Sequence, residues 1–164
     1  MIRVQREDFD VGAEIEKLTA GNLAVGGVCT FVGLVREMVG TEGGDKAISA
    51  MTLEHYPAMT EKMLAEIDAE AHARWPLEGT LVVHRYGRLE PGERIVLVIA
   101  ASKHREASFE ACHFLIDWLK TKAPFWKLED TGADAKWVEA RESDDKAAER
   151  WRAKPGAKPT RAAE

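Results

Sequence analysis

The sequence predicts an α+β domain with a mostly antiparallel sheet flanked by helices. Hydrophobic residues alternate with the two-residue period of strands in several short segments, and amphipathic segments of helical period lie between them. Short polar turns join neighbouring strands. The predicted order is β-α-β-β-α-β-β-α-β-β-α, which lacks the regular alternation of a doubly wound parallel sheet.

The first third of the chain contains a predicted helix between two strands. Asp10 can cap this helix and Gly21 can end it. Residues 25–35, VGGVCTFVGLV, are rich in β-branched side chains, which favours a strand buried on both faces. A polar, glycine-rich loop at 37–46 precedes a further strand at 48–56.

Two longer helices flank a predicted pair of strands. The first helix begins at Thr60 and stops at Pro76. Residues 80–89 and 94–102 form a hairpin-like pair, and the second segment is apolar enough for the middle of a sheet. The second helix covers residues 105–122. The positions at helical spacing are Met63, Leu64, Ile67, Ala71 and Trp75 in the first helix, and Phe109, Cys112, Ile116 and Leu119 in the second.

The C-terminal part of the chain predicts a hairpin, FWKLED and AKWVEA joined by the turn TGAD, and then a short charged helix through Trp151. From Lys154 onward the chain lacks large apolar residues that could anchor it. We therefore expect one domain over residues 1–153 and a disordered tail over 154–164.

The amino-acid composition limits which classes of protein this chain can belong to. The chain has 164 residues, of which 45% are hydrophobic and 31% are charged, as in soluble globular proteins. Its longest aliphatic run, IVLVIAA, is far shorter than the ~20 residues of a membrane-spanning helix. The N-terminus is charged from its third residue, so we expect a cytoplasmic protein. A net charge of −5 disfavours general nucleic-acid binding.

The sequence gives no indication of a metal or cofactor site. The five histidines and two cysteines form no pair with metal-ligand spacing. Cys29 and Cys112 both lie in apolar patterns and are expected to be buried, reduced thiols. We therefore expect neither a bound metal nor a cofactor.

Lysines gather at the end of the second long helix, in LKTKAPFWK. Cations in the last turn of a helix interact favourably with its dipole by ~0.3–1 kcal/mol, and this accounts for Lys122. Lys127 follows Pro124 on a short strand, and the chain reversal could bring it to Lys120. Two ammonium groups at one site repel, so one amine would lose its proton more readily and serve as nucleophile or general base. A solvated charged surface is the alternative interpretation.

A second cluster, SKHRE, places Lys103, His104 and Arg105 at the start of the same helix. The dipole disfavours cations there but favours an anion, so these residues indicate anion binding. Partial relief by Glu106 is the alternative explanation. Other arginines that could face a cleft are Arg36, directly after the strand at 25–35, and Arg85, Arg88 and Arg141.

The length of the helix limits how these clusters can cooperate. Arg105 and Lys120 are fifteen residues apart, and a rise of 1.5 Å per residue separates them by ~22 Å. They cannot both contact one small substrate within a single chain. If both clusters serve one site, a symmetric dimer with two composite sites is required.

Several stretches together resemble a known family. They are TFVGLVR (30–36), LEHYPAMTEKMLAEI (53–67), RWPL (74–77), VVHRYGRLEPGE (82–93), HREASFEACHFLIDWLKTKAPFWKLE (104–129) and WVEARESD (137–144). In this order and extent, from about Val25 to Trp151, they resemble the large, catalytic subunit of molybdopterin synthase.

The resemblance implies a fold, a reaction and partners. The implied fold is an α/β hammerhead. The implied reaction inserts two sulfurs into a cyclic pyranopterin monophosphate to form the dithiolene of molybdopterin. The implied sulfur donor is a small ubiquitin-like subunit whose C-terminal Gly-Gly ends in a thiocarboxylate, in a heterotetramer built on a dimer of large subunits.

The family motifs also imply site residues. The lysines of LKT and FWK fall on Lys120 and Lys127, the implied catalytic pair. Sequence leaves open whether Lys120 is a general acid/base or a transient nucleophile. The implied substrate contacts are Leu34, Val35, Arg36, His104, Arg105, Leu128, Glu129 and Arg141.

This chain departs from the family pattern at Lys103 and in the loop after Arg36, where Glu37 would repel a phosphate if it faced the cleft. The main alternative to the enzyme is a non-catalytic module that binds a phosphorylated ligand or an acidic C-terminal tail in a basic pocket. A structural dimer without a ligand is a further alternative.

Overall fold

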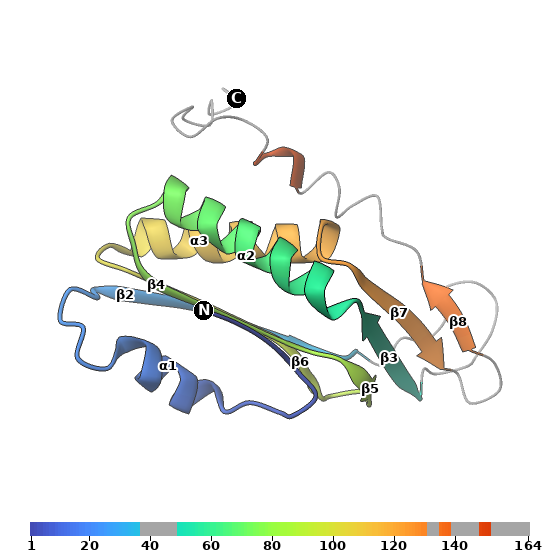
Figure 1. The fold of residues 1–164 in the computed structure, drawn as a ribbon. Helices are drawn as coiled ribbons and strands as arrows, with labels where there is room; N and C mark the ends of the chain where they lie inside the picture. Colours follow the sequence, from blue (N-terminus) through green and yellow to red (C-terminus); the bar gives the residue numbers. More distant parts are fainter. Residues whose placement is uncertain (37–48, 131–134, 139–147, 152–164) are drawn as a thin grey trace, which may run out of the picture.

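The computed structural model describes residues 1–36, 49–130, 135–138 and 148–151. Within these residues, three helices and eight strands make an α+β fold, as the sequence predicts (Figure 1). In chain order they are β1 Ile2–Gln5, α1 Val11–Thr19, β2 Gly27–Leu34, β3 Ala50–His55, α2 Pro57–Arg74, β4 Leu77–Arg85, β5 Gly87–Leu89, β6 Arg94–Ser102, α3 Arg105–Thr121, β7 Phe125–Asp130 and β8 Ala135–Val138.

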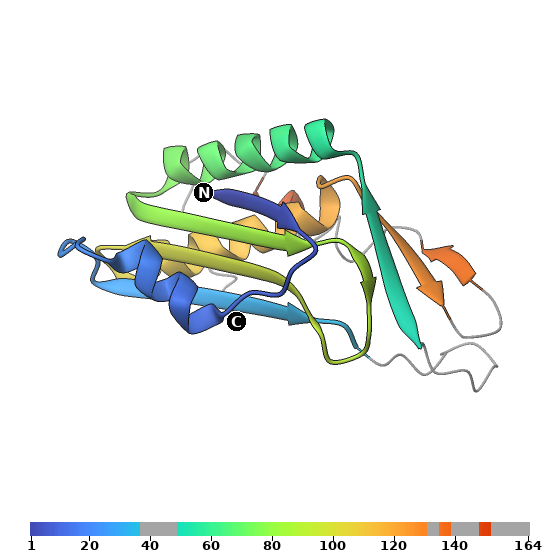
Figure 2. The same ribbon diagram turned by 60° about the horizontal axis from the view of Figure 1, so that its bottom comes forward.

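The described strands form two sheets rather than the single sheet that we expected. Their orders are β1-β4-β6-β2 and β5-β3-β7-β8, and every neighbouring pair is antiparallel except β1 and β4. The segment 80–89, predicted as one strand, divides because Gly87 has a φ of +91°, which L side chains rarely adopt. The chain turns there, and β5 pairs with β3 in the second sheet (Figure 2).

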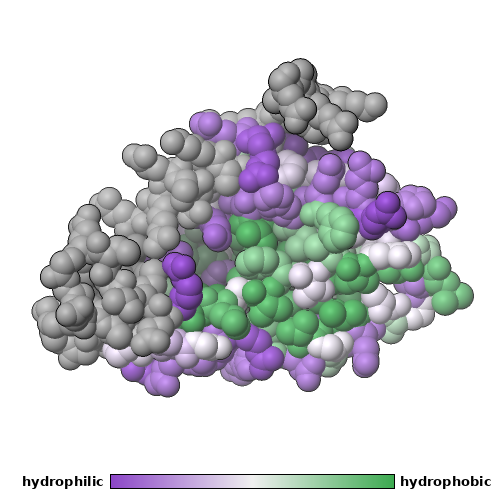
Figure 3. Space-filling view, turned by 180° about the vertical axis from the view of Figure 1, so that it is seen from behind, coloured by the Kyte–Doolittle hydropathy of each residue, from purple (hydrophilic) through white to green (hydrophobic). Residues whose placement is uncertain are grey.

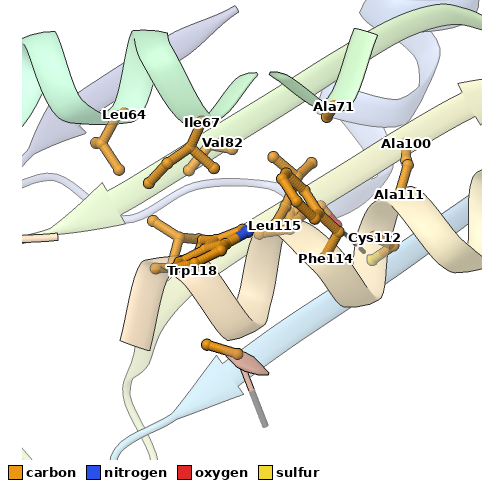
Figure 4. Close-up of a cluster of buried hydrophobic side chains, with 13 residues drawn as sticks. Leu64, Ile67, Ala71, Val82, Ala100, Ala111, Cys112, Phe114, Leu115 and Trp118 are labelled. Carbon is orange, nitrogen blue, oxygen red and sulfur yellow. Dashed lines mark hydrogen bonds between the residues drawn. The ribbon is translucent and has the colours of Figure 1, made fainter. Parts of the chain in front are cut away.

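The first sheet is covered on both faces. Figure 1 shows α2 and α3 on one face and α1 on the other. Alternate residues of β4 and β6 supply the two cores, which explains why both strands are almost continuously apolar. Val82, Val98 and Ala100 pack with α2 and α3, around the fully buried Phe114 (Figure 4). The core on the α1 side contains Phe9, Leu81, Val83, Leu97 and Ile99.

The prediction that residues 25–35 are buried on both faces is wrong. β2 lies at the edge of its sheet, and Phe31 and Leu34 are 38% and 56% exposed. A β-branched run predicts a strand but does not fix its place in the sheet, because sheet order depends on pairing with distant segments.

Two details of the helices also differ from the prediction. α2 begins at Pro57 rather than Thr60, because proline suits the first helical position, where an amide hydrogen has no partner. In α3 the buried stripe includes Ala111, Phe114 and Trp118, whereas Phe109 is 59% exposed. The described helices include none with the length and hydrophobicity needed to cross a membrane.

Candidate active site

A pocket of about 480 Å³ lies where the two sheets meet the C-terminal end of α3. Its walls are largely apolar and come from β2, β3, β4, β6, α3 and β7. On the face opposite to that of Figure 1, hydrophobic residues form a broad area with a hollow at one edge (Figure 3). Four polar side chains line the pocket: Arg36, His84, Lys120 and Lys127.

Lys120 and Lys127 reach this pocket from two elements. Lys120 lies in the last turn of α3, which ends at Thr121. The chain then reverses, with the amide of Phe125 donating to the carbonyl of Ala123 at 2.8 Å, and enters β7. The two-residue period of β7 places both Phe125 and Lys127 at the pocket. The structure thus brings the two lysines together, as the reversal at Pro124 predicts.

The neighbours of these lysines point elsewhere. Lys122 Nζ lies 3.7 Å from the centre of the Trp118 ring, a cation–π contact outside the pocket. Trp126 is 44% exposed and its ring meets that of Tyr56 edge to face. Lys122 therefore fits the interpretation of a surface cation at a helix end.

The last residue of β2 and the two residues after it contribute unequally to the pocket. Leu34 and Arg36 line it, as expected for residues that contact a substrate. Val35 is 3% exposed and packs against Leu53 and Leu89 instead. Its amide donates to the carbonyl of Glu93 at 2.9 Å, so Val35 anchors the backbone rather than lining the pocket.

His104 and Arg105 lie at the other end of α3. His104 occupies the N-cap position without a side-chain capping bond, and Arg105 is the first helical residue. Both side chains are exposed, and neither lines the pocket that holds Lys120. Because α3 is one continuous helix between them, the ~22 Å separation expected from helix geometry applies.

The remaining predicted residues do not line the pocket, or, as for Glu129 and Arg141, have side chains outside the described part of the chain. Leu128 pairs with Thr52 and, by strand alternation, faces away from Lys127. The backbone of Glu129 pairs with that of Met51. Arg141 lies outside the described residues.

The other two candidate arginines have structural roles. Arg85 is buried and donates hydrogen bonds to the backbone carbonyls of Arg6 and Arg94. Arg88 forms an exposed ion pair with Glu90.

His84 lines the pocket although the sequence did not single it out. A signal was present, because the two-residue period of β4 places His84 on the same face as Val82, which packs against α3. In the sequence, His84 was interpreted only as part of a strand and of the family-like stretch VVHRYGRLEPGE, and no site role was given to it.

Comparison with known proteins identifies the family. The family model described as MoaE protein matches residues 4–122, more than half of the chain. The chain belongs to the MoaE family. This confirms the resemblance found in the sequence.

MoaE relatives match along most of their length. A Mesorhizobium japonicum protein named molybdopterin synthase catalytic subunit is 54% identical over 153 residues, 92% of either chain. The solved MoaE protein from Burkholderia ambifaria is 46% identical with a TM-score of 0.77, covering 94% of this chain and 99% of that one. A Helicobacter pylori structure, a complex of subunits 1 and 2 of molybdopterin-converting factor, shares the fold at 22% identity and a TM-score of 0.69, covering 85% and 91%.

Both cysteines of this MoaE-family chain were expected to be buried, but Cys29 is only half-buried; Cys112 does not provide an activated thiol. Cys112 is buried, and this burial, together with the neighbouring Cys29, raises the pKa of its thiol. A protonated thiol is a poor nucleophile. Within the described ranges, no three His, Cys, Asp or Glu side chains form a group that could hold a metal ion.

Proposed function

We propose that this chain inserts two sulfurs into cyclic pyranopterin monophosphate, forming the dithiolene of molybdopterin. As a member of the MoaE family, with relatives named molybdopterin synthase catalytic subunit, the chain is an enzyme subunit. The observation that carries the proposal is the convergence of Lys120 and Lys127 in one largely apolar pocket beside Arg36.

The pocket suits an anionic substrate with a partly apolar body. Its three cations all donate hydrogen bonds, and the guanidinium of Arg36 can bind a phosphate or thiocarboxylate with directed, charge-assisted bonds. All three cations are exposed at the rim of the pocket, so they are accessible to an incoming anionic ligand. At about 480 Å³, the pocket falls within the common range of small-molecule sites.

In the proposed reaction the sulfur arrives on a partner. Cys112 is kept protonated by its burial, so the chain itself offers no sulfur carrier there. We propose that a small ubiquitin-like subunit with a C-terminal Gly-Gly thiocarboxylate inserts its extended tail into the pocket. Lys120 then acts as general acid/base at the carbon that receives sulfur, or as a transient nucleophile at the partner's terminal carbonyl, and Lys127 orients or tunes it. Mass spectrometry distinguishes these roles, because only the nucleophile forms a covalent adduct between Lys120 and the partner.

We further propose that each site is completed by a second copy of the chain. His104 and Arg105 lie a helix length from Lys120, so they can contact the same substrate only from the neighbouring subunit. This arrangement requires a homodimer, the core of a heterotetramer with two small subunits. Leu34, Val35, Leu128, Glu129 and Arg141 remain proposed contacts, with Val35 acting through the backbone that it anchors.

A reconstituted assay tests the proposal. The purified chain is mixed with a thiocarboxylated small subunit and the cyclic pterin monophosphate, and the product is examined for the dithiolene. The proposal predicts dithiolene formation that depends on both additions. Tight binding of either ligand without any dithiolene would indicate the alternative, a module that binds but does not catalyse.

A further inference from the structure

The pocket contains one residue to which no role has been given, His84. It lies on β4, opposite Val96 of β6, and is half-buried at the pocket wall. Arg36, Lys120 and Lys127 can only donate hydrogen bonds. His84 is therefore the only side chain with a nitrogen or oxygen acceptor among the described residues that line the pocket.

The orientation of the His84 ring is fixed on two sides. Its Nδ1 lies 2.9 Å from the backbone carbonyl oxygen of Arg85. Because a carbonyl oxygen can only accept, Nδ1 is the nitrogen that carries the proton. The ring also stacks on Phe125, with centroids 3.8 Å apart and planes inclined by 15°. The tautomer and the direction of Nε2 are thus both set by the fold.

The protonation state of the ring follows from its surroundings. Burial lowers the pKa of His84 to about 4; the hydrogen bond with the Arg85 carbonyl opposes this shift, and the charges of Lys127 and His55 add to it. At pH 7 only about one ring in a thousand would be charged. Nε2 therefore holds a free lone pair, but it is too weak a base to be the proton carrier of the reaction.

Strand geometry indicates which donor can reach this lone pair. Phe125, stacked on His84, precedes Lys127 by two residues on β7, so both side chains lie on the same face of the strand. Lys127 and His84 line the same pocket. An ammonium group carries three donors, so the exposed Lys127 can donate to Nε2 in addition to any other partner.

We propose that His84 is a positioning residue whose Nε2 accepts a hydrogen bond from the Lys127 ammonium. This bond fixes the position of Lys127 relative to Lys120 and to the reacting atoms. The expected effect of His84 on the reaction rate rests on the proposed sulfur transfer. The hydrogen bond between His84 and Lys127 does not depend on it.

Three variants separate this role from simple packing. His84→Phe keeps an aromatic ring against Phe125 and removes the acceptor. His84→Gln can place an amide oxygen near the position of Nε2. His55→Phe is the matched control, because the His55 ring also lies near Phe125, at 5.8 Å, but does not line this pocket.

Kinetics provide the first measurement. Dithiolene formation by His84→Phe should show a kcat lower by roughly 10- to 100-fold with little change in KM, since the reacting groups are misplaced while the substrate still binds. His84→Gln should recover most of the loss, and His55→Phe should resemble the parent. An unchanged kcat in a folded His84→Phe variant overturns the proposal.

Nitrogen NMR of the protein without substrate provides a measurement independent of activity. In the parent, long-range ¹H–¹⁵N spectra should show His84 protonated at Nδ1, and the Lys127 ammonium signal should be visible at low temperature. That signal should vanish in His84→Phe and return in His84→Gln. If the parent shows the proton on Nε2, the proposal is wrong, and this result does not depend on whether the variants fold.

The two measurements also distinguish this proposal from the proposed function. A protein that shows these NMR signals but makes no dithiolene would contradict the proposed sulfur transfer, while the proposed hydrogen bond would still be supported.

Discussion

The stacked rings of His84 and Phe125, 3.8 Å apart, join the two sheets beside the pocket. His84 belongs to β4 in the first sheet, and Phe125 belongs to β7 in the second. Because Lys127 follows Phe125 by two residues, its place in the pocket depends on this contact between sheets. The packing of the fold and the geometry of the proposed site are therefore directly connected.

Lowering the pH should destabilise the protein through His84. Burial lowers the pKa of His84 to about 4, whereas an unfolded histidine has a pKa of about 6.5. The unfolded chain therefore binds more protons between these values, and the stability from neutral His84 is complete above about pH 6.5 and lost as the pH falls towards 4. We expect a loss of up to about 3 kcal/mol.

Urea unfolding of the parent and of His84→Phe at pH 7 and pH 4.5 measures this effect. The variant should lose less stability than the parent over this interval. The hydrogen bond from Arg94 lowers the pKa of Asp8, so that group loses its contribution at still lower pH, and equally in both proteins. The same pH dependence in parent and variant would show that His84 is not the responsible group.

The core between α2, α3 and the first sheet should depend strongly on Phe114. This side chain is fully buried, and its ring meets those of Trp75, Trp118 and Trp151 edge to face. Phe114→Ala should cost ~3–5 kcal/mol of unfolding free energy, because it removes apolar contacts and leaves a cavity. Denaturant unfolding measures the loss.

Phe109→Ala is the matched control on the same helix. Phe109 is 59% exposed, so its removal should change the unfolding free energy by less than ~0.5 kcal/mol. Equal losses for the two variants would mean that the buried stripe of α3 has been assigned to the wrong face.

The proposed composite site predicts complementation between subunits. Lys120→Ala and Arg105→Ala should each be inactive alone, because every site lacks one group. After unfolding and refolding as a mixture, half of the dimers are mixed, and each mixed dimer has one intact site. Activity should then return to about a quarter of the parent level. If the mixture stays inactive while mass spectrometry shows mixed dimers, both residues belong to the same subunit's site.

Patterns of local origin predicted the elements well. The cap at Asp10, the end of α3 before Pro124 and the strand at 125–130 depend on neighbouring residues, and the structure has each of them. Sheet order depends on distant segments. The exposed edge position of β2 was therefore missed, since it follows from which distant strands pair within its sheet. The division of 80–89 was missed because the turn at Gly87 was interpreted as part of one strand.

In the candidate site, too, the features that depend on neighbouring residues were predictable and those that depend on distant segments were not. The convergence of Lys120 and Lys127 was predictable because a short reversal joins a helix end to a strand, and the separation of Arg105 from Lys120 follows from helix rise alone. His84 reaches the pocket through tertiary packing, so the sequence pattern showed only which face of β4 it occupies. A cytoplasmic location and the tail at 154–164 stay predictions.

Replacing Lys120 tests the central claim most directly. Lys120→Ala should abolish dithiolene formation with the thiocarboxylated partner and pterin precursor, while its affinity for the partner stays within a few-fold of the parent. Lys122→Ala, at the same helix end but in contact with Trp118 rather than the pocket, should keep near-parent activity. If Lys120→Ala forms dithiolene within a few-fold of the parent rate, Lys120 is not the catalytic amine.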